Sequence, residues 1–287
     1  MTQHPTFDKH TLLQQIDWQD LRHLNLWQKT YNIALPFIFL GLSWGCVHQG
    51  HLLIACVLSY FFTITAYRLG HDLYHRALGV HHHLATMLLL LISLVSFSSL
   101  HSMRYSHLEH HRNPLGEHDE EGYLAHGTWW QALLGGLWFR YRIYKHGYRL
   151  APRREQYKIL FESLLIVGVA IMAWYAQVEV LIYQFVVMFV INACAGVFAV
   201  WGLHHDCDDT IARTERNPII NALTFGLFYH VEHHLFPAVP TEHLPKLAKR
   251  LDAHYPHLSN YRVMPRLADL LPSGNRDTCP FWRLVGA

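Results

Sequence analysis

Residues 52–75 read LLIACVLSYFFTITAYRLGHDLYH, and this stretch decides the fold of the chain. Its first part, Leu52 to Leu69, is an apolar run close to the ~20 residues that a membrane-spanning helix needs. Its last part, His71-Asp-Leu-Tyr-His75, places two imidazoles four residues apart, the spacing of neighbours on one helix face. The stretch therefore predicts a membrane helix that ends in two converging histidines.

Two further clusters repeat this pattern, His107-Leu-Glu-His110-His111 and His230-Val-Glu-His233-His234. With the first cluster they hold eight of the 25 histidines, all at helical spacings of three or four residues. A lone histidine on a helix is usually structural, but three such clusters facing each other predict a metal site. Imidazole suits iron, zinc and copper, and eight nitrogen ligands are too many for one ion and suit two.

The apolar runs predict an all-α integral membrane protein with four transmembrane helices. Hydrophobic residues make up 51% of the 287 residues and charged residues 15%, against ~25% charged in an average soluble domain. The four runs are 31–47, 52–69, 159–176 and 180–203, and very short turns join them into two hairpins, 31–69 and 159–203. We expect one domain over 1–287, with a polar N-terminal segment at 1–29 and a C-terminal cap at 204–287.

A fifth run, Leu84 to Leu100, has 17 residues and ends in serines. The first and third histidine clusters each follow an even-numbered membrane helix, so both lie on one side of the membrane. The second cluster can join them only if residues 84–100 do not cross, and we expect a re-entrant or buried segment there. Nine Lys and Arg lie within 101–158 and nine follow residue 203, whereas the far turns hold none. The positive-inside rule therefore places the clusters and both termini in the cytoplasm.

The motifs HxxxH, HxxHH and HxxHH, in this order around two hairpins, resemble the histidine boxes of membrane fatty acid desaturases. The wider family includes hydroxylases, ketolases and acetylenases. The stretch Tyr229-His-Val-Glu-His-His-Leu-Phe-Pro-Ala-Val-Pro, followed by His243-Leu-Pro, is especially similar to acyl desaturases. The resemblance covers roughly residues 30 to 250, and its motifs are specific as a set.

The resemblance implies a non-haem centre of two iron ions that uses O2 as co-substrate to remove hydrogen from an unactivated methylene. Carried over to this chain, the ligands are His71, His75, His107, His110, His111, His230, His233 and His234. Family members often add one histidine at the end of the helix before the last box, and here Trp201-Gly-Leu-His204-His205-Asp206 fills that place. Spacing does not choose between His204 and His205, and we favour His205.

Metal-bound histidines usually donate their second nitrogen to a carboxylate or carbonyl. The acids within or beside the clusters are candidates for this role: Asp72, Glu109, Asp206, Asp208, Asp209 and Glu232. Asn221 matches an asparagine often seen in the family, or is a helix-start residue. We interpret His81, His82 and His83 as a polar rim, because consecutive residues splay around a helix.

The expected activity is an oxygen-dependent acyl desaturase of the bacterial inner membrane. Its alternative is a hydroxylase, ketolase or acetylenase on an acyl or isoprenoid chain. An acyl chain would lie in an apolar tunnel lined by the second and fourth helices and by residues 84–100. No haem or flavin domain and no CxxC pair is visible, so we expect a separate electron donor such as a ferredoxin, a rubredoxin or a small cytochrome. The basic segment 140–158 is a candidate docking surface for that donor, and it could equally bind anionic lipid head groups or the phosphates of an acyl carrier.

A histidine-rich metal transporter is a different class of protein. Transporters place ionisable ligands near the middle of the bilayer, whereas these histidines sit at helix ends. A purely structural membrane protein would have no use for eight converging imidazoles. No nucleic-acid partner is expected.

Overall fold

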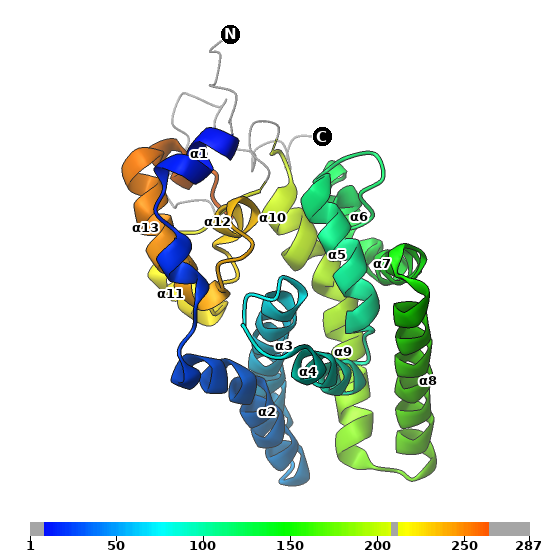
Figure 1. Cartoon of the computed structure of the whole chain (residues 1–287). Helices are drawn as coiled ribbons and strands as arrows, with labels where there is room; N and C mark the ends of the chain where they lie inside the picture. The colour runs from blue at the N-terminus through cyan, green and yellow to red at the C-terminus, as the bar shows by residue number, and fades with distance from the viewer. Residues whose placement is uncertain (1–8, 208–211, 264–287) are drawn as a thin grey trace.

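The computed structural model describes residues 9–207 and 212–263, and that part of the chain is all-helical. Its only β feature is an isolated bridge between Thr214 and Arg262. The predicted all-α class is therefore confirmed for the described part. Figure 1 shows long helices extending toward one end of the molecule and short helices gathered at the other.

Two helical hairpins form the long end. The first joins α2 (Leu26–His48) to α3 (Leu52–Tyr74), and the second joins α8 (Arg153–Tyr175) to α9 (Glu179–Ala195). The π-helical turn η3 (Gly196–Trp201) and α10 (Gly202–His204) continue α9, so the last span reaches 26 residues and the others 23. At ~1.5 Å per residue each exceeds the ~30 Å hydrocarbon core of a bilayer, and the four predicted spans are confirmed by length and composition.

The first span starts five residues before the predicted one because of a capping box. The Asn25 side chain accepts from the backbone N–H of Gln28 at 2.9 Å, and the Gln28 side chain accepts from the N–H of Asn25 at 3.0 Å. This satisfies donors that would otherwise lack partners at the helix start. Apolarity alone does not detect it, since the cap is polar.

The outer surfaces of the hairpins are apolar. On α8, Leu164 is 71% exposed and Ile171 61% exposed, which suits lipid and not water. Polar contacts lie between the helices instead. Trp44 donates to the Gln184 side chain at 3.1 Å, and Gln184 donates to the carbonyl of Val95 at 2.9 Å. Hydrogen bonds between helices stabilise their packing in a membrane, because burying apolar side chains out of lipid contributes little to helix association.

Helices α4 (His82–Ser96) and α5 (Leu100–Arg112) meet at a bend of 108°. Phe97 turns the chain in the left-handed region at φ 49°, and Ser99 caps the start of α5. Figure 1 shows α4 end-on, lying across the two hairpins, while α5 points toward the end where the short helices gather. The segment predicted at 84–100 is thus the crosswise helix α4 together with its turn.

Helices α6 (Trp129–Leu134) and α7 (Gly136–Leu150) carry the aromatic and basic stretch between the hairpins. Two glycines let α7 approach its neighbours closely. A Cβ on Gly136 would lie 1.7 Å from the carbonyl of Ala193 in α9, and one on Gly147 would lie 1.9 Å from the carbonyl of Ser102 in α5. Trp130 and Trp138 remain exposed, as expected of a helix at a membrane interface.

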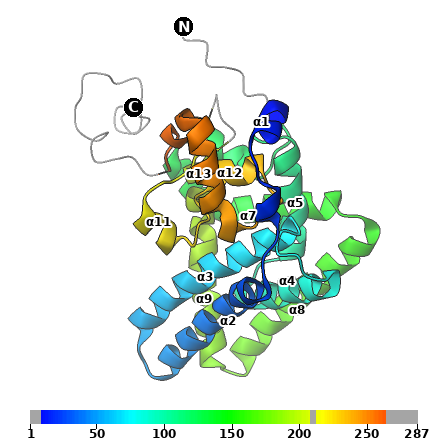
Figure 2. The same ribbon diagram turned by 60° about the vertical axis from the view of Figure 1, so that its left-hand side comes forward.

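The remaining helices cover the ends of α3 and α5. Figure 2 shows α1 and α13 lying against α12. A core that includes Leu12, Val231, Leu235, Leu247 and Leu251 joins α1 (Lys9–Gln15), η1 (Gln19–Arg22), α12 (His230–Leu235), α13 (Leu244–His254) and η5 (Pro256–Asn260). The other short helices are η2 (Gly122–His126), α11 (Pro218–Leu223) and η4 (Thr241–His243).

Candidate metal centre

Five histidines from three elements form a first group. Their ligand atoms all lie within 4.8 Å of one another. The Nε2 atoms of His75 and His107 are 3.0 Å apart, and those of His233 and His111 are 2.8 Å apart. The group takes its members from the end of α3, from α5 and from α12: His71, His75, His107, His111 and His233.

Four histidines form a second group beside the first. The ligand atoms of His110, His204 and His234 lie within 4.8 Å of one another, and all three residues are buried. His230 joins them, because its Nε2 lies 3.0 Å from that of His204 and 3.2 Å from that of His234. The rings of His111 and His234 stack at 4.3 Å, so the two groups adjoin.

Helical periodicity explains how the boxes divide. In α5, His107 and His111 are four residues apart and point into the first group, whereas His110 points into the second. In α12, His233 belongs to the first group while His230 and His234 belong to the second. Each of these short helices therefore contributes to both groups, and the eight box histidines all come together.

The structure brings His204 into the second group, and His205 lies outside both groups. The ring of His205 stacks on Trp201 at 3.9 Å and 6°, and its Nδ1 contacts the Trp201 carbonyl at 2.7 Å. The helix ends at His204, because His205 has an extended backbone at ψ 144°. Because the helix ends between them, the side chains of His204 and His205 point in different directions, and the residue that the sequence analysis favoured, His205, is the one outside the groups.

The two groups have the chemistry of a metal centre. Both ring nitrogens of His71 and Nε2 of His110 are buried and have no hydrogen-bond partner among the described residues. Burial, followed by repulsion from His107, lowers the pKa of His75 to about 2. Burial also lowers the pKa values of His111, His230, His233 and His234. Neutral imidazoles with free lone pairs are the form that binds a metal, so the residues present fit iron ions.

Two acids that were not among the sequence candidates are hydrogen-bonded to Nδ1 of box histidines, the ring nitrogen on the other side from Nε2. The Nδ1 of His110 lies 2.6 Å from Asp119, and the Nδ1 of His107 lies 2.9 Å from Glu121. Burial is the largest single influence on the pKa of His110 and lowers it, but the hydrogen bond to Asp119 together with the negative charges of Glu121 and Asp119 raises that pKa overall. The signal in the sequence was the acidic run at 117–121, only six residues beyond the second box.

The acids that we did select have other roles. Asp72 accepts from the backbone N–H of Thr241 at 3.0 Å and from its hydroxyl at 2.7 Å, which ties the end of α3 to η4. Glu109 pairs with Arg112 at 3.0 Å on the surface of α5. Neither carboxylate is hydrogen-bonded to a box histidine.

The other selected residues also bond elsewhere. Glu232 is fully buried and accepts from Thr214 at 2.6 Å and from Arg216 at 2.5 Å. Asn221 donates to the carbonyl of Glu215 at 2.9 Å. Asp206 is exposed in a turn at φ 48°. Asp208 and Asp209 lie outside the described residues.

The three consecutive histidines are exposed, as a polar rim would be, but they do not splay. The ligand atoms of His81, His82 and His83 lie within 4.8 Å of one another. The physical reason is that α4 begins only at His82, so His81 is an extended capping residue at ψ 146°. The helical geometry that separates consecutive side chains does not apply to it.

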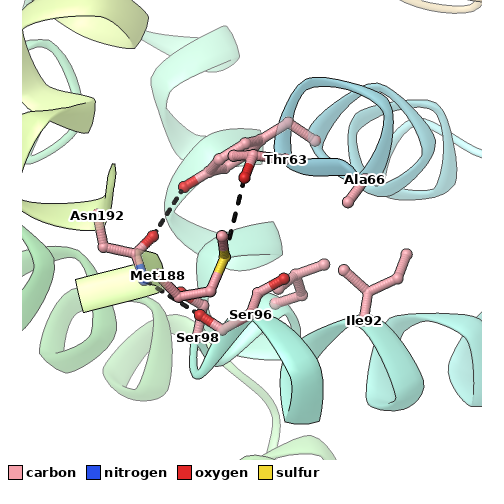
Figure 3. A pocket seen from close by; sticks show the side chains of 9 residues that line it. Thr63, Ala66, Ile92, Ser96, Ser98, Met188 and Asn192 are labelled. Carbon is pink, nitrogen blue, oxygen red and sulfur yellow. Dashed lines mark hydrogen bonds between the residues drawn. The ribbon is translucent and has the colours of Figure 1, made fainter. Parts of the chain in front are cut away.

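A pocket lies between α3, the bend after α4, and α9. Figure 3 shows Thr63 and Ala66 above it, Ile92 and Ser96 below it and Met188 beside it. Ala66, in its wall, precedes His71 of the first group by five residues on α3, about 1.4 turns of helix. Asn192 donates to the carbonyl of Ser96 at 3.1 Å and fixes one wall. The full lining is Thr63, Ala66, Tyr67, Ile92, Ser96, Ser98, Leu100, Met188 and Asn192.

The chain has four helices that are long and apolar enough to span a membrane, and nine histidines come together near one end of them. These features define a polytopic membrane protein with a polyhistidine site. The family model described as fatty acid desaturase matches residues 42–265. The chain therefore belongs to the fatty acid desaturase family, as the resemblance of its boxes predicted. No curated protein matches the chain. Membership indicates an oxidoreductase and a membrane location.

Proposed function

We propose that the chain is a membrane-bound, O2-dependent acyl desaturase that holds two iron ions. The observation that carries the proposal is the convergence of all three boxes on two adjoining groups. Helix α3, which carries the first box, also lines a pocket between membrane helices. The first iron takes the group of five, and the second takes the group of four. Oxygen activation is the chemistry that bound iron supplies at such a site.

His204, and not His205, is the ninth ligand in this proposal. Its Nε2 lies 3.0 Å from that of His230, whereas the ring of His205 stacks on Trp201 and belongs to neither group. Asp119 and Glu121 fix the rings of His110 and His107 through their outer nitrogens. Such partners set the orientation and basicity of a ligand.

The pocket holds the part of the acyl chain next to the reacting carbon. Ala66, Ile92, Leu100 and Met188 give it an apolar surface that suits a methylene chain. The packed helices around it keep water from the reacting carbon. The polar atoms of Thr63 and Asn192 are turned to neighbouring side chains and backbone, so they do not need a polar substrate.

The site faces the cytoplasm, and α4 does not cross the bilayer. Support comes from the 108° bend between α4 and α5, which lets the second box meet the other two at one end of the hairpins. A separate electron donor approaches from the same side. Its basic docking surface is smaller than the sequence predicted, because Arg140 is buried and Arg142 pairs with Glu120 at 2.5 Å. Lys145, Arg149, Arg153 and Arg154 remain exposed.

The test is expression in a bacterial host that makes only saturated and monounsaturated acyl chains, followed by lipid analysis and iron counting. We expect new double bonds in cells with the wild-type chain and two irons per purified chain. The variant His107→Ala should lose both products and iron, whereas His126→Ala, at an exposed histidine outside the groups, should keep both.

Other outcomes separate the alternatives. An alcohol, ketone or alkyne with no new alkene would replace desaturation by the related reactions of the family. Purified protein that carries zinc across vesicles and contains no iron would overturn the enzyme assignment. The protein purified from the same cells for iron counting shows that the chain was expressed, so a failure of expression does not imitate either result.

A further inference from the structure

The exposed cluster of His81, His82 and His83 lies apart from the nine histidines of the candidate metal centre, and the proposed reaction makes no use of it. Its rings are close together. The ring centroids of His82 and His83 are 3.9 Å apart, and His81 lies 5.3 Å from His82 and 5.1 Å from His83. All three residues are exposed, so no packing demand accounts for the arrangement.

The start of α4 produces this convergence. The backbone N–H of His83 donates to Nδ1 of His81 at 3.4 Å, which folds the capping imidazole back over the first helical turn. This contact occupies Nδ1 of His81 and leaves its Nε2 for another partner. A histidine pair at the helix start and a histidine folded back onto it thus face the same small volume.

We propose that His81, His82 and His83 form a second, surface metal site for a borderline divalent ion such as Zn²⁺ or Cu²⁺. Imidazole is a good ligand for these ions, and three protein ligands with an open fourth position for water is a common zinc arrangement. Tetrahedral bonds of ~2.0–2.1 Å need nitrogens about 3.4 Å apart. The present spread of up to 4.8 Å closes by side-chain rotation, which is unhindered because the rings are exposed. The site takes one ion per chain, in addition to the iron of the buried centre.

The experiment is equilibrium dialysis of the iron-loaded, untagged protein against Zn²⁺, with zinc and iron counted together. The test variant is His81→Ala/His82→Ala/His83→Ala. The matched control is His48→Ala/His51→Ala/His126→Ala, which removes three exposed histidines that belong to no group. We expect the test variant to bind one zinc fewer than wild type and the control to bind as wild type does. Iron content should be equal in all three.

Equal zinc binding by wild type and the test variant would overturn the proposal, as would equal losses in both triple variants. A loss of iron in the test variant would show that the cluster belongs to the buried centre and would overturn its independence. The single variant His82→Ala preserves the contact between His81 and the His83 backbone, so it tests the site if the triple variant does not fold. It should weaken zinc binding without abolishing it. None of these readouts depends on the proposed desaturase activity.

Discussion

Substitution of Asp119 by asparagine should weaken iron binding although Asp119 touches no metal. The carboxylate accepts four hydrogen bonds, from His110 Nδ1 at 2.6 Å and from the backbone N–H groups of Leu115, Glu121 and Gly122 at 2.8, 3.0 and 2.9 Å. One oxygen serves His110 and Leu115, and the other serves Glu121 and Gly122. The amide of asparagine has one oxygen only, so its NH2 must face two donors.

The size of the effect follows from these contacts. Loss of a hydrogen-bonding partner behind a metal ligand typically lowers metal affinity ~10–100-fold. This corresponds to about 1.4–2.8 kcal/mol. One of the two donors left without an acceptor is buried and the other part-buried, and the buried one destabilises the loop by a further ~1–3 kcal/mol. Asp119→Asn should therefore reduce both iron affinity and the stability of the metal-free protein.

The assay is competition for iron with a chromogenic chelator, on protein purified in detergent. We expect Asp119→Asn to surrender half its iron at a chelator concentration ~10–100-fold lower than wild type does. The matched control is Glu109→Gln, because Glu109 adjoins the same box but pairs with Arg112 on the surface. Glu121→Gln should be milder than Asp119→Asn, since an amide oxygen can still accept from His107. If Asp119→Asn keeps its iron as well as wild type does, or if Glu109→Gln loses as much iron as Asp119→Asn, Asp119 does not support iron binding through His110.

Four further predictions follow the same geometry. His204→Ala should lose iron and activity while His205→Ala keeps its iron, and iron counting on the purified pair contradicts the ligand assignment if the order is reversed. Glu162→Ala should lower the free energy of unfolding by ~1–3 kcal/mol for each buried partner that it leaves without an acceptor, because Glu162 lies 2.7 Å from Nδ1 of His101 and accepts from Ser99, and Glu162→Gln should cost less in the same denaturation curve. Ala66→Phe should fill the pocket and reduce product formation at unchanged iron content, and unchanged product would place the substrate elsewhere. Removal of the iron with a chelator should lower the unfolding temperature of the wild type. The loss of stability is ~2.7 kcal/mol if the free iron concentration before chelation was 100 times the dissociation constant. An unchanged unfolding temperature would argue against a buried metal centre.

Much of the fold was accessible from local patterns. The runs at 31–47, 52–69, 159–176 and 180–203 marked all four long helices, because each apolar stretch is continuous in sequence. The spacing of the boxes predicted that their histidines would converge, since three and four residues repeat one helix face. The requirement that they meet on one side then constrained 84–100, and the 108° bend fits that constraint.

The outer partners of the ligands were not accessible in this way. Glu109 and Glu232 stand inside the boxes, but helical geometry turns them away from the faces that carry the histidines. Asp119 and Glu121 reach the site because the chain after α5 folds back over it. Hydrogen bonds that backbone N–H groups of this loop donate to the Asp119 carboxylate hold it there. The position of these acids depends on the conformation of a loop, and a loop has no repeating sequence pattern from which that conformation could be predicted.

Regular spacings and continuous apolar runs were enough to predict the class of the protein, its four long helices and the eight histidines of the boxes. That His204 and not His205 lies with them could be seen in the folded chain alone, because the choice depends on the residue at which a helix ends. The fold also sets how the nine histidines divide into two groups and which acids contact them. The same reason explains the cluster at His81: one extended residue before a helix brought together side chains that helical spacing would separate.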